Sequence, residues 1–287
     1  MGRHGTTHPD LPGGDPLPPA RETGAGRLID SHAHLLHLRD GLTPEQALDE
    51  ARAVGVEVVL NIGDDASDNR PGLELTERIA GLRTTIGRHP HSAGEPISGE
   101  ERRELRAMAA HPNVVAIGEI GLDYHWTDVH KVAPRAQATL FRQMLALALE
   151  VGKPVVLHTR DAFADQLAIL DEFPGVEGVF HCFSGNAAIA AEALARGFYL
   201  SFAGTVTYPT AHPVIGAASI IPLDRMLVET DSPFLPPQSR RGKPNAPRFL
   251  VETVERLATL RQSTAQEIGA ATRKNAIDLF RLQHGTH

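Results

Sequence analysis

The sequence has little cysteine, few aromatic residues and no long apolar run. Its single cysteine, Cys182, excludes an internal disulfide and favours a reducing cytoplasm as the location. No stretch approaches the about 18 consecutive apolar residues of a membrane-spanning helix, and no apolar segment follows the N-terminus as in a secretory signal. We therefore expect a cytoplasmic protein with no membrane partner, and the sequence indicates no obligate protein partner.

An excess of basic residues is also lacking, since the formal net charge is −7. Acidic proteins are poorly suited to loose electrostatic binding of nucleic acid. The charge does not exclude a nucleic-acid enzyme, because bound divalent cations and a local group of basic residues reverse the field at a site. The 287 residues are enough to form a large core without disulfides.

The chain divides into a short leader and one repeating α/β pattern. Residues 1–26 are rich in glycine, proline and threonine, which predicts a disordered N-terminal extension. Residues 27–287 form the predicted domain. In it, eight apolar runs typical of strands cover residues 28–31, 56–62, 83–87, 114–118, 154–158, 178–181, 198–202 and 226–229. Helical patterns cover residues 44–54, 72–80, 99–110, 133–151, 163–172, 187–196, 248–261 and 264–282.

Eight strands that alternate with helices over roughly 260 residues predict an α/β fold, the TIM (β/α)₈ barrel. A doubly wound open sheet is the alternative. It is less favoured, because no glycine-rich phosphate-binding turn follows any of the predicted strands. In a TIM barrel, catalytic residues gather at the carboxyl ends of the strands.

Histidines and carboxylates stand at five of these strand ends. His32 and His34 follow the first strand at positions i and i+2, which point to the same face of an extended chain. The ends of strands four, five, six and eight carry Glu119, His158, His181 and Asp231. Such nitrogen and oxygen ligands suit Zn²⁺, Mn²⁺ or Fe²⁺, and also Mg²⁺ where carboxylates dominate.

Six ligands are more than one catalytic metal needs, so the pattern predicts two divalent cations about 3.5–4 Å apart. Glu119 is the expected bridge, because strand four lies between the two groups of histidines. A carboxylate inside an apolar strand costs several kcal/mol unless it is paired or bound to a metal. Cys182 is expected to be a small buried residue and not a nucleophile. Asp30 is expected to support the structure or the ligands.

These motifs resemble the TatD-type metal-dependent deoxyribonucleases of the amidohydrolase superfamily. The resemblance covers about residues 27–282 and rests on the segments DSHAHL, GRHPH, AIGEIGLDY, PVVLHTRDA, GVFHCFSG, SFAGTVT and VETDSPFL. It implies a TIM-type barrel with a two-metal site and a DNA exonuclease activity. It assigns one metal to His32 and His34, the other to His158 and His181, the bridge to Glu119, and metal binding with proton transfer to Asp231.

The chain departs from the family pattern at two positions. Ala246 stands where family members usually carry an acidic residue, within the segment 241–247 that follows strand eight. Its effect is expected on the support of that loop and on substrate preference, and not on the six ligands. Arg88 stands where a small or apolar residue is common.

The expected chemistry is phosphodiester hydrolysis by a hydroxide that bridges the two metals, with Asp231 accepting the proton of the water. His89 is a candidate donor to a phosphate oxygen, and stabilisation of its own loop is the alternative. Candidates for holding flanking phosphates are Arg160, Arg240, Arg241 and Lys243, for which solvated surface charges are the alternative. Candidates for stacking on unpaired bases, or else for loop packing, are Tyr124, Trp126, Phe183 and Tyr208.

The expected partner is therefore DNA as a substrate, single-stranded or at its 3′ ends. Two other functions remain open from the sequence. The same site chemistry suits an amidohydrolase or esterase, including an aminoacyl-tRNA deacylase, because a metal-activated hydroxide attacks carbon as well as phosphorus. A metal-binding barrel without catalysis is the second alternative.

Overall fold

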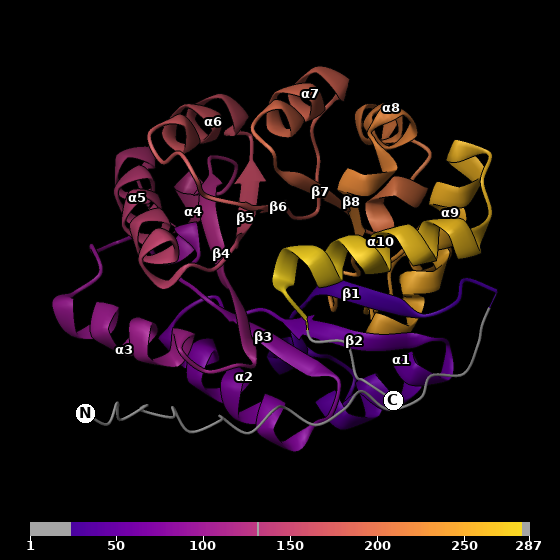
Figure 1. Cartoon of the computed structure of the whole chain (residues 1–287), viewed down its shortest axis with the longest axis horizontal. Helices are drawn as coiled ribbons and strands as arrows, with labels where there is room; N and C mark the ends of the chain where they lie inside the picture. The colour runs from indigo at the N-terminus through magenta and orange to yellow at the C-terminus, as the bar shows by residue number, and fades with distance from the viewer. Residues whose placement is uncertain (1–23, 131, 283–287) are drawn as a thin grey trace, which may run out of the picture.

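Eight parallel strands pair in chain order in the computed structural model, which describes residues 24–130 and 132–282 (Figure 1). The sheet closes where Ala33 of β1 forms an isolated parallel bridge with Ser232, in the segment that follows β8, and the His34 N–H donates to the Ser232 carbonyl at 2.7 Å. The strands are β1 Leu28–Ala33, β2 Val56–Asn61, β3 Leu82–Ile86, β4 Val114–Asp123, β5 Val155–Arg160, β6 Gly178–Phe180, β7 Tyr199–Phe202 and β8 Met226–Val228. The predicted TIM (β/α)₈ barrel is confirmed.

Helices surround these strands (Figure 1). They are α1 Pro44–Ala53, α2 Ala66–Arg78, α3 Gly99–Ala109, α4 Thr127–His130, α5 Pro134–Val151, α6 Phe163–Asp171, α7 Ala187–Ala195, α8 His212–Ile220, α9 Leu250–Arg261 and α10 Ala265–Phe280. Within the described ranges, no helix combines the length and the apolar character needed to span a membrane.

Helix α5 illustrates how the sequence pattern becomes packing. Its apolar stripe predicts one buried face, and Leu140, Phe141 and Met144 on that face are buried in the main core. Gly152 follows with φ +65°, a left-handed conformation that ends helices readily because glycine has no Cβ. The helix therefore ends where the sequence predicts.

Strand β4 extends five residues beyond its predicted end at 118 and reaches Asp123. Its close approach to β5 needs glycine: Gly121 has φ +143°, and a Cβ there would lie 2.0 Å from the His158 carbonyl oxygen. The pairing of β4 with β5 also shifts register between Ile117 and Ile120. The strand consequently carries both Glu119 and Asp123 to the carboxyl end of the barrel.

Helix α2 begins at Ala66, six residues before the predicted start, so that boundary was wrong. Asp65 caps the helix by accepting from the Ser67 N–H at 2.8 Å, and Pro71 lies in the helix interior, where proline is uncommon.

The predicted extension, residues 1–26, lies mostly outside the described residues. In the described part, Ala25 is buried, and the Ala25 carbonyl packs closely against Gly269 of α10.

Candidate metal centre

The two histidines at the end of β1 point to the same place. His32 Nε2 and His34 Nε2 lie 3.2 Å apart, and both side chains are buried. Their common direction follows from the i, i+2 spacing on extended backbone, as predicted. Two imidazole nitrogens at this distance present a pair of ligand atoms to one small volume.

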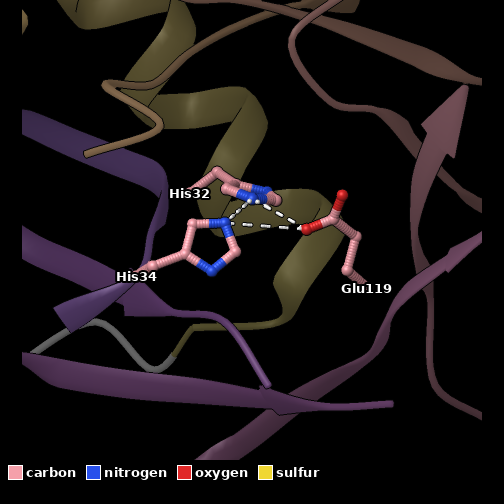
Figure 2. Close-up of side chains that lie close together, drawn as sticks. All are labelled: His32, His34 and Glu119. Carbon is pink, nitrogen blue, oxygen red and sulfur yellow. Dashed lines mark hydrogen bonds and ion pairs between the residues drawn. The ribbon is translucent and has the colours of Figure 1, made fainter. Parts of the chain in front are cut away.

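Glu119 lies between two pairs of histidines. Its Oε2 atom is 3.2 Å from His32 Nε2 and 3.7 Å from His34 Nε2, and the three side chains point toward one another (Figure 2). Its Oε1 atom is 2.7 Å from His158 Nδ1 and 2.8 Å from His181 Nε2. The carboxylate thus presents one oxygen to each pair, which is the geometry of a bridging ligand.

Asp231 approaches the first pair from the segment after β8. Its Oδ1 atom lies 3.5 Å from His34 Nε2 and 3.8 Å from His32 Nε2. The Asp231 N–H donates to the His32 carbonyl at 2.9 Å, so the backbone fixes this side of the centre. All six side chains that the sequence singled out as ligands are therefore brought together.

Two carboxylates orient the second pair, and the sequence reasoning did not assign them a role. His158 Nε2 lies 3.0 Å from Asp123 Oδ2, and His181 Nδ1 lies 3.2 Å from Glu229 Oε1. A carboxylate on the outer nitrogen fixes the tautomer and direction of a ligating imidazole. Both acids carry the signal that identified Glu119, an acid that follows apolar residues at a strand end.

The first pair is supported less directly, because the buried His32 Nδ1 atom has no hydrogen-bond partner among the described residues. Asp64 Oδ2 lies 3.4 Å from His34 Nδ1. Asp30 is buried and accepts from the Thr230 N–H at 2.9 Å and from the Thr230 hydroxyl at 2.6 Å, which joins β1 to the segment after β8. The expectation of a supporting role for Asp30 is consistent with these bonds.

Burial and the neighbouring charges together set the protonation of the imidazoles. Burial, followed by the neighbouring His181, lowers the pKa of His32 to about 4, so that ring is neutral and offers a lone pair. Burial opposes protonation of His34 too, but Asp64, Asp231 and Glu119 outweigh it and raise its pKa to about 9. The pKa of His181 is also raised, because Glu119 and Glu229 overcome the effect of burial. The centre therefore attracts positive charge.

This donor set fits divalent cations. Four groups of possible ligand atoms, each within 4.8 Å of one another, occur among the described residues. They are His32 with His34 and Glu119, His32 with His181 and Asp231, His89 with Glu119 and His158, and His37 with Asp64 and Asp68. Nitrogen and carboxylate oxygen are ordinary ligands of Zn²⁺ and Mn²⁺, and metal binding competes with protons for such groups.

The match to a known family model covers nearly the whole barrel. The model described as TatD related DNase matches residues 29–281. The chain belongs to this family. An uncharacterized metal-dependent hydrolase of Bacillus subtilis, YabD, is 39% identical over 257 residues, which cover 89% of this chain and 99% of that protein. The 3′-5′ ssDNA/RNA exonuclease TatD of Cronobacter turicensis is 38% identical over 245 residues, which cover 82% and 91%.

Solved structures agree with this membership. The TatD homologue YjjV of Escherichia coli superposes with a TM-score of 0.82 at 29% identity and covers 90% of this chain and 100% of its own. The phosphotriesterase homology protein of Escherichia coli has a TM-score of 0.62 at 16% identity, over 89% and 99%, which shows a shared fold only. The protein is a metal-dependent hydrolase of the TatD family.

His89 lies beside the TatD centre, where the sequence predicts a donor to phosphate. Its Nε2 atom is 3.6 Å from Glu119 Oε1, and its Nδ1 atom accepts from the His91 N–H at 3.2 Å. Burial and the nearby His158 hold the pKa of His89 well below its usual value. A neutral ring that accepts at Nδ1 carries its proton on Nε2, which faces the centre.

The other predicted phosphate contacts lie on the rim and not at the centre. Arg160 lies over the ring of Trp126 at 5.3 Å, and Arg241 lies over the ring of Tyr208 at 4.7 Å. Lys243 lines a cleft between the segments 39–50 and 240–249. Their roles toward substrate stay predictions.

Three other residues singled out in the sequence, Phe183, Cys182 and Tyr124, differ in exposure and contacts. Phe183 is buried, which removes it as a platform for bases. Cys182 is half-buried, so the expectation of a buried residue was only partly right, and its N–H donates to Glu229 Oε1 at 2.8 Å. Tyr124 donates its hydroxyl to Asp165 at 2.7 Å.

The structure shows the surroundings of the two departures from the family pattern. Ala246 is buried in the wall of the cleft, and the neighbouring Asn245 supports the loop by donating to the carbonyls of Thr230 and Phe234 at 2.7 and 2.8 Å. Arg88 pairs with Glu101 at 3.1 Å, away from the six ligands.

Proposed function

We propose that this TatD-family hydrolase is an exonuclease that removes nucleotides from the 3′ ends of single-stranded DNA with two divalent cations. The observation that carries the proposal is the position of Glu119, whose two oxygens face two separate pairs of histidines at 2.7–3.7 Å. A relative with the name 3′-5′ ssDNA/RNA exonuclease supports the substrate class.

The ligands in this proposal are the six predicted residues. His32, His34 and Asp231 would hold one cation, His158 and His181 would hold the other, and Glu119 would contribute one oxygen to each. When bound, the cations supply a water of lowered pKa and positive charge against the phosphoryl oxygens. Mg²⁺, Mn²⁺ and Zn²⁺ are all compatible with this donor set.

The protein side chains then complete the hydrolysis. The water oxygen bonds to phosphorus, the bond from phosphorus to the leaving strand breaks, and the leaving oxygen takes up the proton that Asp231 has received from the water. Asp231 accepts the proton of the water, because its carboxylate reaches the first histidine pair and is only 9% exposed at the side chain. His89 donates from Nε2 to a phosphate oxygen, and this N–H donor stabilises the negative charge that develops on that oxygen.

The test uses three variants: Glu119→Ala, His158→Ala and Asp231→Asn. Each is assayed on a 5′-labelled single-stranded oligonucleotide after chelation and addition of Mg²⁺, Mn²⁺ or Zn²⁺. We expect metal-dependent shortening by the wild type and a loss of at least about 100-fold in each variant, with unchanged circular dichroism. The matched control is His111→Ala, in the loop before β4 at the opposite end of the barrel.

Parallel assays on RNA, duplex DNA, a lactone and an aminoacyl-tRNA separate this proposal from the carbon-centred hydrolases. Turnover of the lactone or the aminoacyl ester without any shortening of DNA would reject the exonuclease. Activity that persists in all three variants, or that is indifferent to EDTA, would reject the two-cation site.

A further inference from the structure

An exposed aromatic ring lies directly beside the candidate metal centre. Phe234 is 40% exposed, and its ring centroid lies 5.5 Å from that of His34 at an interplanar angle of 75°. Its N–H donates to the Asp231 carbonyl at 2.8 Å, and its carbonyl accepts from Asn245 at 2.8 Å. The backbone therefore fixes an apolar face toward solvent next to a proposed ligand.

A cleft of about 900 Å³ is lined by two residues that contact Phe234, although Phe234 itself does not line it. Arg39 lines this cleft and also lies over the Phe234 ring, with Cζ 5.6 Å from the centroid. Asn245, which holds the Phe234 carbonyl, lines the cleft from the other side. The cleft thus lies between the segment 39–50, which follows β1, and the segment 240–249, which follows β8, and Phe234 lies between it and His34 of the centre.

Two positively charged side chains of the cleft have no acidic partner among the described residues and are available to an anionic ligand. Arg248 pairs with Glu50, and Arg240 pairs with Glu252 at 3.1 Å. Arg39 and Lys243, in contrast, contact no carboxylate among the described residues. Of the acidic residues in the wall, Asp49 pairs with Arg52 at 3.0 Å, which leaves only Asp40 opposing them.

We propose that Phe234, Arg39 and Lys243 form a binding site for the nucleotide next to the cleaved phosphodiester. The base stacks on Phe234, and the following phosphates bind Arg39 and Lys243 as the strand enters the cleft. An aromatic platform beside a cationic groove binds unpaired strands, because each base has a π-face that a duplex hides. This inference rests on the proposed exonuclease function and names where its substrate binds.

The first test measures KM on a short oligothymidylate and on versions with one abasic residue at each of the last three positions. For the wild type, we expect one abasic position to raise KM by roughly 5- to 100-fold, as loss of one stacked base would. Phe234→Ala should raise KM on the intact strand by a similar factor. In this variant, an abasic residue at that position should no longer change KM. Phe234→Trp should restore both. Ile220→Ala, a 65% exposed residue at the far end of α8, is the matched control.

The second test measures the salt dependence of binding. Each phosphate contact contributes about −0.7 to the slope of log K against log salt for a single strand. Arg39→Ala and Lys243→Ala should each reduce the slope by about this amount, whereas Arg103→Ala on the outer helix α3 should not change it.

The inference is overturned if Phe234→Ala keeps the full sensitivity to the abasic position. It is also overturned if Trp126→Ala, at another exposed aromatic side chain, removes that sensitivity instead. Fluorescence anisotropy of the same strands needs no cleavage and therefore separates the two proposals. Base-dependent binding without shortening rejects the exonuclease alone, and shortening without a contribution from Phe234 rejects this site alone.

Discussion

Asp123 Oδ2 accepts from His158 Nε2 at 3.0 Å, while Nδ1 of the same ring faces Glu119 at 2.7 Å. The ring is therefore held from both sides by carboxylates. The hydrogen bonds from His158 and His91 outweigh the opposing effect of burial and lower the pKa of Asp123, so its carboxylate is ionised across the working range of pH. Asp123 thus fixes which nitrogen of His158 is turned to the centre.

Asp123→Asn should weaken metal retention without unfolding the barrel. Loss of a carboxylate partner of a ligating histidine typically costs 10- to 100-fold in metal affinity, and we expect about this loss for one of two cations. Isothermal titration with Mn²⁺ after chelation measures it. Asp165→Asn, which removes a carboxylate that accepts from Tyr124 and contacts no imidazole among the described residues, is the control. Equal affinity in both variants would show that Asp123 plays no part in metal binding.

Metal removal should lower the thermal stability of the wild type. A ligand present at about 100 times its Kd stabilises the folded state by about 2.7 kcal/mol, which corresponds to a Tm change of roughly 5–10 °C for a domain of this size. Glu119→Ala should lose most of this response, because both proposed cations share that carboxylate. Differential scanning calorimetry with EDTA and with added Mn²⁺ measures the response. Glu104→Ala, which removes an exposed carboxylate, is the control. A Tm change in Glu119→Ala as large as in the wild type would mean that the cation binds elsewhere.

The sequence predicted the barrel and the six clustered side chains because both depend on short-range patterns. Period-2 spacing turns His32 and His34 to one side, and parallel strands bring their carboxyl ends to one edge. The closure of the eight-stranded sheet into a barrel then places Glu119 between both histidine pairs. The number of predicted strands already indicated this closure.

The supporting acids were not assigned because their positions depend on three-dimensional details. Asp123 reaches His158 only because β4 continues through a register shift to its last residue, five residues past the predicted end. The Phe234 site could not be predicted either, since Arg39 and Phe234 lie 195 positions apart in sequence and meet only when β8 closes against β1.

Arg273→Met should destabilise the fold by about 2–3 kcal/mol. Glu57 on β2 is buried and pairs with Arg273 of α10 and with Arg27 at 2.7 Å, so removing one arginine leaves a buried carboxylate half-compensated. Urea unfolding measures the change. Lys274→Met, which removes a 74% exposed cation from the neighbouring position, should change stability by less than about 1 kcal/mol. Similar values for both variants would contradict a structural role for the Glu57 pairs.

The thiol of Cys182 should react slowly in the folded protein. Burial, with added repulsion from Asp231, Glu229 and Glu119, raises its pKa well above the usual value, and the thiolate is the reactive form. At about pH 8, where a free cysteine is partly ionised, we expect labelling by a disulfide reagent to be at least about 10-fold slower than in denaturant. Cys182→Ala should retain hydrolysis, since the contact of this residue with Glu229 comes from its backbone N–H. Fast native labelling, or loss of activity in this variant with its metal content intact, would mean that the thiol takes part in the chemistry.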